Sequence, residues 1–120
     1  MTAARNDLTI EAGAFFQFNG VVQAANRAPV SLVGYGARMQ VRKRREEPTA
    51  AVSLTMGAGI ALGGETGSFV VTLDGDQTTA IAAAMAKGVY DLWLDPDGTK
   101  SANSIRVMEG EVNILLPVTR

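Results

Sequence analysis

The sequence predicts an all-β domain, either a sandwich or a barrel, and two observations lead to this fold class. Strand-like segments recur roughly every eight to twelve residues, with glycine, proline or aspartate between them. Within these segments apolar and polar residues alternate, which is typical of strands with one buried face. The chain has 120 residues, enough for one domain that buries roughly two thirds of its unfolded surface.

The first predicted strands are short and alternate clearly. Their inward-facing residues are Leu8, Ile10, Phe16, Phe18 and Val22. Phe15 has the opposite parity to Phe16 and Phe18, so we expect it on the outer side of its strand. An aromatic ring on that side makes Phe15 a candidate interface residue.

Residues 36–43 show the cleanest alternation in the chain. Ala37, Met39 and Val41 are expected to face the core, while the side chains between them are polar: Arg38, Gln40 and Arg42. A slip of one residue would bury two arginines, so the register of this strand is strongly specified. We include Arg38 and Arg42 among the candidate interface residues.

Three further strands precede the one segment that lacks alternation. Their apolar residues are Val52, Leu54, Ile60, Leu62, Phe69, Val71 and Leu73. A short helix is then predicted near residues 75–86, which are rich in alanine. Asp74 can cap its first turn together with Gln77, Gly88 can end it in a left-handed conformation, and Ile81 and Met85 share one stripe facing the sandwich.

Residues 87–98 and 104–114 predict two or three antiparallel strands separated by a polar turn, and they carry the most informative residue. Tyr90, Leu92 and Leu94 share the inward parity, which places Trp93 on the outer face beside Asp91 and Asp95. An outward tryptophan is typical of an interface anchor. The alternative is that a second sheet, the helix or a loop covers Trp93 within the same chain. Trp93 and Asp91 complete the candidate interface residues, with Arg38, Arg42 and Phe15.

The residue types argue against an enzyme and against a nucleic-acid or metal site. There is no histidine and no cysteine, which removes the commonest general base, metal ligand and thiol nucleophile. The formal net charge is -1, and the basic residues 42–45 point to both sides of a strand end that continues into two glutamates. We interpret this segment as an exposed hairpin tip with paired charges. Residues 95–98 are interpreted as a turn, and Glu109 and Glu111 as a solvated face.

The ends of the chain complete the domain prediction. Residues 1–6 are expected to form a flexible arm, and residues 7–120 a single β-sandwich domain. Residues 1–7 contain no apolar signal segment, and the uncharged run at 48–64 is shorter than a membrane helix and contains four glycines. We therefore expect no membrane segment, and no cofactor is expected.

Five segments, read together, resemble a family of small structural proteins of tailed bacteriophages. They are residues 7–18, 30–43, 59–64, 88–94 and 108–112, and the likeness spans nearly the whole chain. These proteins are similar to the immunoglobulin-like N-terminal domain of upper baseplate proteins. The resemblance implies an immunoglobulin-like antiparallel β-sandwich without catalytic residues. The position of Trp93 is usually polar in that family, so this departure favours a contact specific to one partner.

The resemblance also implies the function that we expect. The chain would be a non-enzymatic structural protein of a virion assembled in the host cytoplasm, in the tail or baseplate. Its partners would be other virion proteins and copies of itself, with neither nucleic acid nor membrane. A head-decoration or neck adaptor role is an alternative, favoured because the chain stops soon after the sandwich. A carbohydrate-binding module is the alternative from another class, because such modules also present an aromatic ring from a β face.

Overall fold

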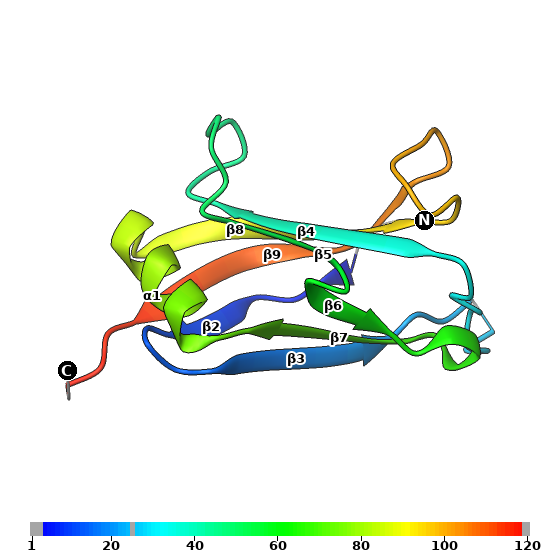
Figure 1. Ribbon diagram of the computed structural model, residues 1–120, viewed down its shortest axis with the longest axis horizontal. Helices are drawn as coiled ribbons and strands as arrows, with labels where there is room; N and C mark the ends of the chain where they lie inside the picture. The colour runs from blue at the N-terminus through cyan, green and yellow to red at the C-terminus, as the bar shows by residue number, and fades with distance from the viewer. Residues whose placement is uncertain (1–3, 25, 119–120) are drawn as a thin grey trace.

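The structure, a computed structural model, describes residues 4–24 and 26–118 (Figure 1). Its elements are β1 (Ala4–Arg5), β2 (Leu8–Glu11), β3 (Phe16–Val21), β4 (Gly36–Arg42), β5 (Val52–Met56), β6 (Gly59–Leu62), a 3-10 turn (Gly64–Thr66), β7 (Ser68–Leu73), α1 (Gly75–Ala84), β8 (Lys87–Asp95) and β9 (Ile105–Leu115). The predicted all-β class with one short helix is confirmed.

The strands form one continuous hydrogen-bonded path that folds over on itself. The order is β1, β9, β8, β4, β5, β6, β7 and β3, and β2 joins the path at β9. Figure 1 shows two layers, with β9, β8, β4 and β5 in the upper one and β6, β7 and β3 in the lower one. The path passes between the layers where β6 pairs with the end of β5.

This order is that of an immunoglobulin-like sandwich. In the nomenclature of that fold, β9, β8, β4 and β5 correspond to strands G, F, C and C′, and β3, β7 and β6 to strands B, E and D. The prediction of an antiparallel sandwich needs one correction, because β1 and β2 pair with β9 in parallel and β6 pairs with β5 in parallel. All other strand pairs are antiparallel.

The core lies between the two layers and contains the residues that the alternation predicts. Ala37, Met39 and Val41 of β4 are at most 4% exposed. The other predicted inward residues that are buried are Leu8, Ile10, Val22, Leu54, Ile60, Phe69, Val71, Leu73, Tyr90, Leu92 and Leu94. Phe16, Phe18, Val52 and Leu62 are half-buried and pack against this core. Alternation was therefore a reliable guide to which face of each strand is buried.

Helix α1 covers one end of the sandwich and begins where the sequence predicts. The Asp74 carboxylate accepts from the N–H of Gln77, whose side chain accepts from the N–H of Asp74. Ile81 and Met85 are buried, as the predicted stripe requires. The predicted helix end is wrong, because the helix ends at Ala84, and Met85 is already extended. Gly88 belongs to β8, where a side chain would collide with the carbonyl oxygen of Arg42.

The predicted N-terminal arm lies partly in the sheet. Residues 1–3 lie outside the described residues, whereas Ala4 and Arg5 form β1 and pair with β9. The N–H of Asn6 donates to the carbonyl oxygen of Glu109 at 2.9 Å. A strand of two residues shows no alternation, and its partner is distant in the sequence, so this pairing left no pattern to detect.

Candidate functional site

A groove on the outer side of the upper layer gathers four of the five candidate interface residues. We call it the outer groove; it has a volume of about 730 Å³. It is lined by Arg38, Met39, Gln40, Arg42, Arg45, Ser53, Leu54, Thr55, Val89, Tyr90, Asp91, Trp93, Lys100, Ser101 and Ser104. Figure 1 shows the loops 43–51 and 96–104 rising from the same side of this layer, one toward each end. These loops supply Arg45 at one end and Lys100 at the other.

Strand register places the floor residues next to one another. Because β4 and β8 are antiparallel neighbours, Arg38 is paired with Trp93, and Gln40 with Asp91. Side chains of directly opposed residues on one face lie close enough to interact. The outer face thus combines an aromatic ring, a carboxylate and an amide at neighbouring positions of two paired strands.

Trp93 has the predicted orientation, and a residue of the same chain partly covers it. Its side chain is half-buried, and the guanidinium carbon of Arg38 lies 4.9 Å from the ring centroid. This is a cation–π contact, and it holds both side chains in place. Arg38 of β4 covers the ring, rather than a second sheet, the helix or a loop, and Trp93 still lines the groove. Its role as an interface anchor stays a prediction.

Asp95 anchors the groove at the end near loop 96–104, a role that the sequence interpretation missed. The sequence placed it on the outer face and at the start of a turn, yet it is 4% exposed. Its carboxylate accepts from Nε of Arg38 at 3.2 Å and from the hydroxyl of Ser104 at 2.6 Å. Asp95 has the expected outward parity, but its own hairpin loop and Arg38 cover it. The buried carboxylate therefore orients the arginine that lies over Trp93.

Loop 96–104 is held in shape by its own polar groups. The hydroxyl of Ser101 and the side-chain amide of Asn103 both donate to the carboxylate of Asp97, at 2.7 and 3.1 Å. These hydrogen bonds hold the pKa of Asp97 below its usual value. Gly98 has a positive φ of 85° and donates its N–H to the carbonyl oxygen of Asp95. The predicted turn at residues 95–98 is thus present.

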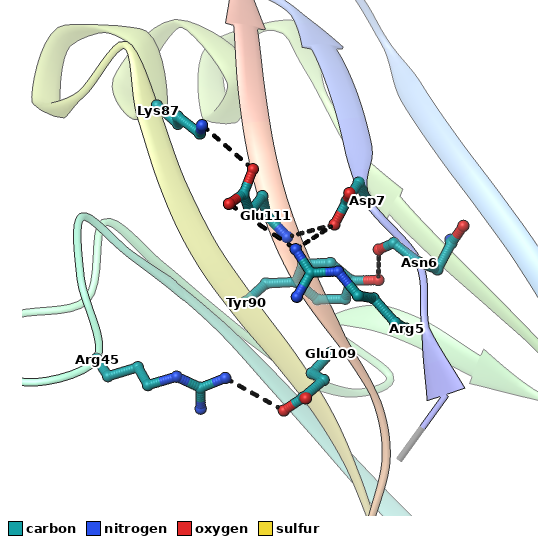
Figure 2. Close-up of polar contacts among 8 residues, drawn as sticks. All are labelled: Arg5, Asn6, Asp7, Arg45, Lys87, Tyr90, Glu109 and Glu111. Carbon is teal, nitrogen blue, oxygen red and sulfur yellow. Dashed lines mark hydrogen bonds and ion pairs between the residues drawn. The ribbon is translucent and has the colours of Figure 1, made fainter.

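The basic segment at the opposite end is a hairpin tip with paired charges, as predicted. Arg44 lies 3.3 Å from a carboxylate oxygen of Glu47, and Arg45 lies 3.2 Å from one of Glu109 (Figure 2). Arg42 differs, because it donates to neutral oxygens, the carbonyl of Glu47 and the side chain of Gln40. Its charge therefore remains available at the groove.

Phe15 is the candidate residue that does not join the groove. It lies between β2 and β3, outside the upper layer, and is 65% exposed. Its predicted outward orientation agrees with this exposure. Any contact that Phe15 makes with another molecule would use a surface separate from the outer groove.

Behind the groove, a cluster of hydrogen bonds ties the N-terminal segment to β8 and β9. We call it the N-terminal clamp, and Figure 2 shows its side chains. The hydroxyl of Tyr90 donates to the carbonyl oxygen of Asn6, and the N–H of Glu111 donates to the carboxylate of Asp7 at 2.9 Å. Gly110 lets the chain pass closely, since a Cβ there would lie 2.3 Å from the Asn6 oxygen.

Replacing Tyr90 by phenylalanine is expected to destabilise the fold in a pH-dependent way. The pKa of Tyr90 is raised from 10.0 to about 12, mainly by burial. The hydrogen bond to Asn6 lowers this pKa, and the charge of Asp7 raises it, by smaller amounts. The folded chain therefore keeps this proton at pH values where the unfolded chain loses it. The contribution of the hydroxyl is complete below about pH 10 and disappears as pH rises toward 12. Below pH 10 the loss should be about 1 kcal/mol, the net value of one hydrogen bond.

Urea unfolding of both proteins between neutral pH and pH 12 measures this difference. The wild-type advantage should narrow at alkaline pH, and a Tyr35→Phe variant controls for the loss of a phenol elsewhere. An advantage that stays constant or grows with pH would contradict the assignment.

Comparisons with known proteins give no family for this chain. No family model matches it, and no curated protein matches it. Among solved structures, two studies of voltage-gated sodium channel beta subunits provide similar chains. One concerns multimeric cell-adhesive interactions and aligns with a TM-score of 0.44 at 8% identity, covering 92% of each chain. The other is a parallel homodimer of the beta4 extracellular domain, with a TM-score of 0.43 at 9% identity, covering 98% of this chain and 97% of that one.

Similarity at this level does not say what this chain binds. In the part of the chain that the structure describes, no helix is long and apolar enough to cross a membrane.

Proposed function

We propose that this chain is a non-enzymatic structural protein of a tailed-phage virion, in the tail or baseplate, and that it binds a neighbouring virion protein through the outer groove. The observation that carries the binding role is the pairing of Trp93 with Arg38 on the groove floor. Tryptophan and arginine are the residue types that most often dominate the energy of protein interfaces. The virion assignment depends on the sequence resemblance described above.

The charges of the groove indicate the chemistry of the partner. Its lining contains the cations Arg38, Arg42, Arg45 and Lys100 and the carboxylate Asp91. Asp95 pairs with Arg38, and Glu109 is shared between Arg45 and Arg106. Within the lining, Arg42 and Lys100 remain in excess over Asp91. A partner segment with acidic side chains and one apolar group for Trp93 would complement this surface.

The groove is preorganised for such a contact. Arg38 is fixed between Asp95 and the Trp93 ring, and Arg42 is fixed by Gln40 and the carbonyl of Glu47. Side chains that are already ordered lose less conformational entropy when a partner binds. A contact of this kind needs no reacting group, which agrees with the absence of histidine and cysteine from the sequence.

Electron microscopy of intact particles, with antibodies or a fused tag marking this chain, tests the virion assignment. Density for the sandwich at the tail or baseplate, with the outer groove against a neighbouring protein, is the expected result. A chain absent from purified particles would overturn the proposal. Density on the capsid surface or at the neck would instead support the head-decoration or adaptor alternative, because each location has its own symmetry.

A carbohydrate-binding module remains the second candidate, and the groove offers one observation in its favour. Trp93 lies among hydrogen-bonding side chains, including Gln40 and Asp91. However, the guanidinium of Arg38 already covers a ring face, and a stacked sugar would have to displace it. Because Trp93 is the one tryptophan in the sequence, a saturable fluorescence change during titration with glycans would favour this candidate.

A further inference from the structure

Strand β3 is an edge strand in the lower layer, away from the outer groove. It is the last strand of the sheet order, and among the described residues it pairs with β7 alone. Figure 1 shows it along the lower border of the molecule. An edge strand presents unpaired N–H and C=O groups that can bind another strand.

The ladder between β3 and β7 identifies which residues present these groups. The N–H of Val22 donates to the carbonyl oxygen of Gly67 at 2.8 Å, and this pair continues the register of the two strands. In an antiparallel ladder, hydrogen-bonded and non-hydrogen-bonded pairs alternate. Phe16, Phe18 and Gly20 therefore bond to β7, whereas Gln17, Asn19 and Val21 direct their N–H and C=O groups to the free edge.

The free edge carries none of the features that usually prevent pairing. The strand reads Phe-Gln-Phe-Asn-Gly-Val and contains no charged residue and no proline, and no bulge interrupts its register with β7. Natural edge strands commonly use lysine, proline or bulges to block association. The edge of β3 is therefore open to another strand.

The outward side chains of this edge read the same in both directions. Phe15, which immediately precedes β3, and Gln17, Asn19 and Val21 of β3 are, in order, apolar, amide, amide and apolar, and all are exposed. Phe15 is 65% exposed and Val21 is 53% exposed, and they stand at opposite ends of the edge. A two-fold antiparallel pairing places Phe15 against Val21 of the second copy, and Gln17 against Asn19 of the second copy.

We propose that β3 pairs with β3 of a second copy of this chain in this register. The pairing joins the outward backbone groups of both edges and covers the exposed apolar side chain at each end. It brings no like charges together, and the palindromic order satisfies the self-complementarity that a two-fold interface requires. Pairing with an unrelated strand would not require a palindromic order of side chains. The interface goes beyond the proposed function, because it lies on the other layer and leaves the outer groove free.

Charge variants of the full chain test this proposal. Gln17→Lys with Asn19→Lys places lysine opposite lysine twice, and a matched variant carries Gln17→Glu with Asn19→Glu. Sedimentation equilibrium should show a wild-type dimer, association weakened by about tenfold in each variant, and recovery of the dimer when the two variants are mixed in equal amounts. Ala80→Lys with Ala84→Lys, on the exposed face of α1, adds the same charge elsewhere and should leave the dimer unchanged.

A third variant tests the register itself. Gln17→Lys with Asn19→Glu places opposite charges across the proposed pair, so it should dimerise at least as tightly as the wild type. A register that pairs Asn19 with Asn19 would place glutamates together and weaken this variant.

Thermal unfolding followed by circular dichroism verifies that each variant is folded. A wild-type chain that is monomeric at every soluble concentration would overturn the proposal, as would a dimer that both double-charge variants preserve. These outcomes are distinguishable from failure of the groove, because Trp93→Ala should leave the dimer intact.

Discussion

Replacing Trp93 by alanine is expected to weaken partner binding in the outer groove by about 2 kcal/mol or more, the loss typical of a central aromatic anchor. The fold should survive, because Trp93 is half-buried on the outer face and the core beneath it is unchanged. The loss of the contact with Arg38 should cost the folded chain only about 0.5–1 kcal/mol. Isothermal titration against virion proteins isolated from the same particles measures the change in binding free energy. Urea unfolding measures the change in the free energy of unfolding.

A Trp93→Phe variant is the matched control, because it keeps an aromatic ring under Arg38. It should retain most of the binding that alanine loses. Two results would contradict the assignment. Unchanged binding in Trp93→Ala would exclude the groove as the contact surface. Loss of cooperative unfolding in that variant would assign Trp93 to the core.

Replacing Gly110 by valine is expected to release the N-terminal clamp and lower the free energy of unfolding by about 2–4 kcal/mol. A Cβ at this position would lie 2.3 Å from the Asn6 oxygen, so the segment containing Asn6 and Asp7 must move away from β9. Three hydrogen bonds would then be lost: those from Asn6 to Glu109, from Tyr90 to Asn6 and from Glu111 to Asp7. Each contributes about 0.5–1.5 kcal/mol. Urea unfolding gives the total, and amide exchange at Asn6 reports the local release.

Asn113→Val provides the control for this variant, because it places valine on the outer side of the same strand, clear of the clamp. It should change stability by less than about 0.5 kcal/mol. If Gly110→Val is as stable as the wild type and the Asn6 amide stays protected, the close passage over Gly110 is not required for the fold.

Local patterns in the sequence predicted most of the fold because most of its elements are specified locally. The alternation in residues 36–43 fixed the inward side of β4, and the Asp74 and Gln77 capping box fixed the start of α1. The helix end was mispredicted because a glycine near it suggested a left-handed cap. Gly88 is required instead for its close approach to the carbonyl of Arg42.

The candidate site was predictable in its members but not in its detail. Parity alone placed Arg38, Arg42, Asp91 and Trp93 outward, and strand pairing then brought them into one groove. Parity could not show that loop 96–104 folds back over Asp95, or that Arg38 covers the tryptophan ring. Those contacts join residues from different strands and loops, so no periodic signal encodes them. The parallel pairing of β1 with β9 could not be predicted for the same reason, because it joins segments that are far apart in the sequence.

The pairing of the first strands with the last one has a consequence for how the protein is made. A ribosome synthesises β1 and β2 long before β9, yet β9 is the strand with which both of them pair. Contacts between such distant parts of a chain form late and slowly. In the nascent chain, β1 and β2 therefore cannot form their pairing with β9 until translation has passed Leu115, the last residue of β9.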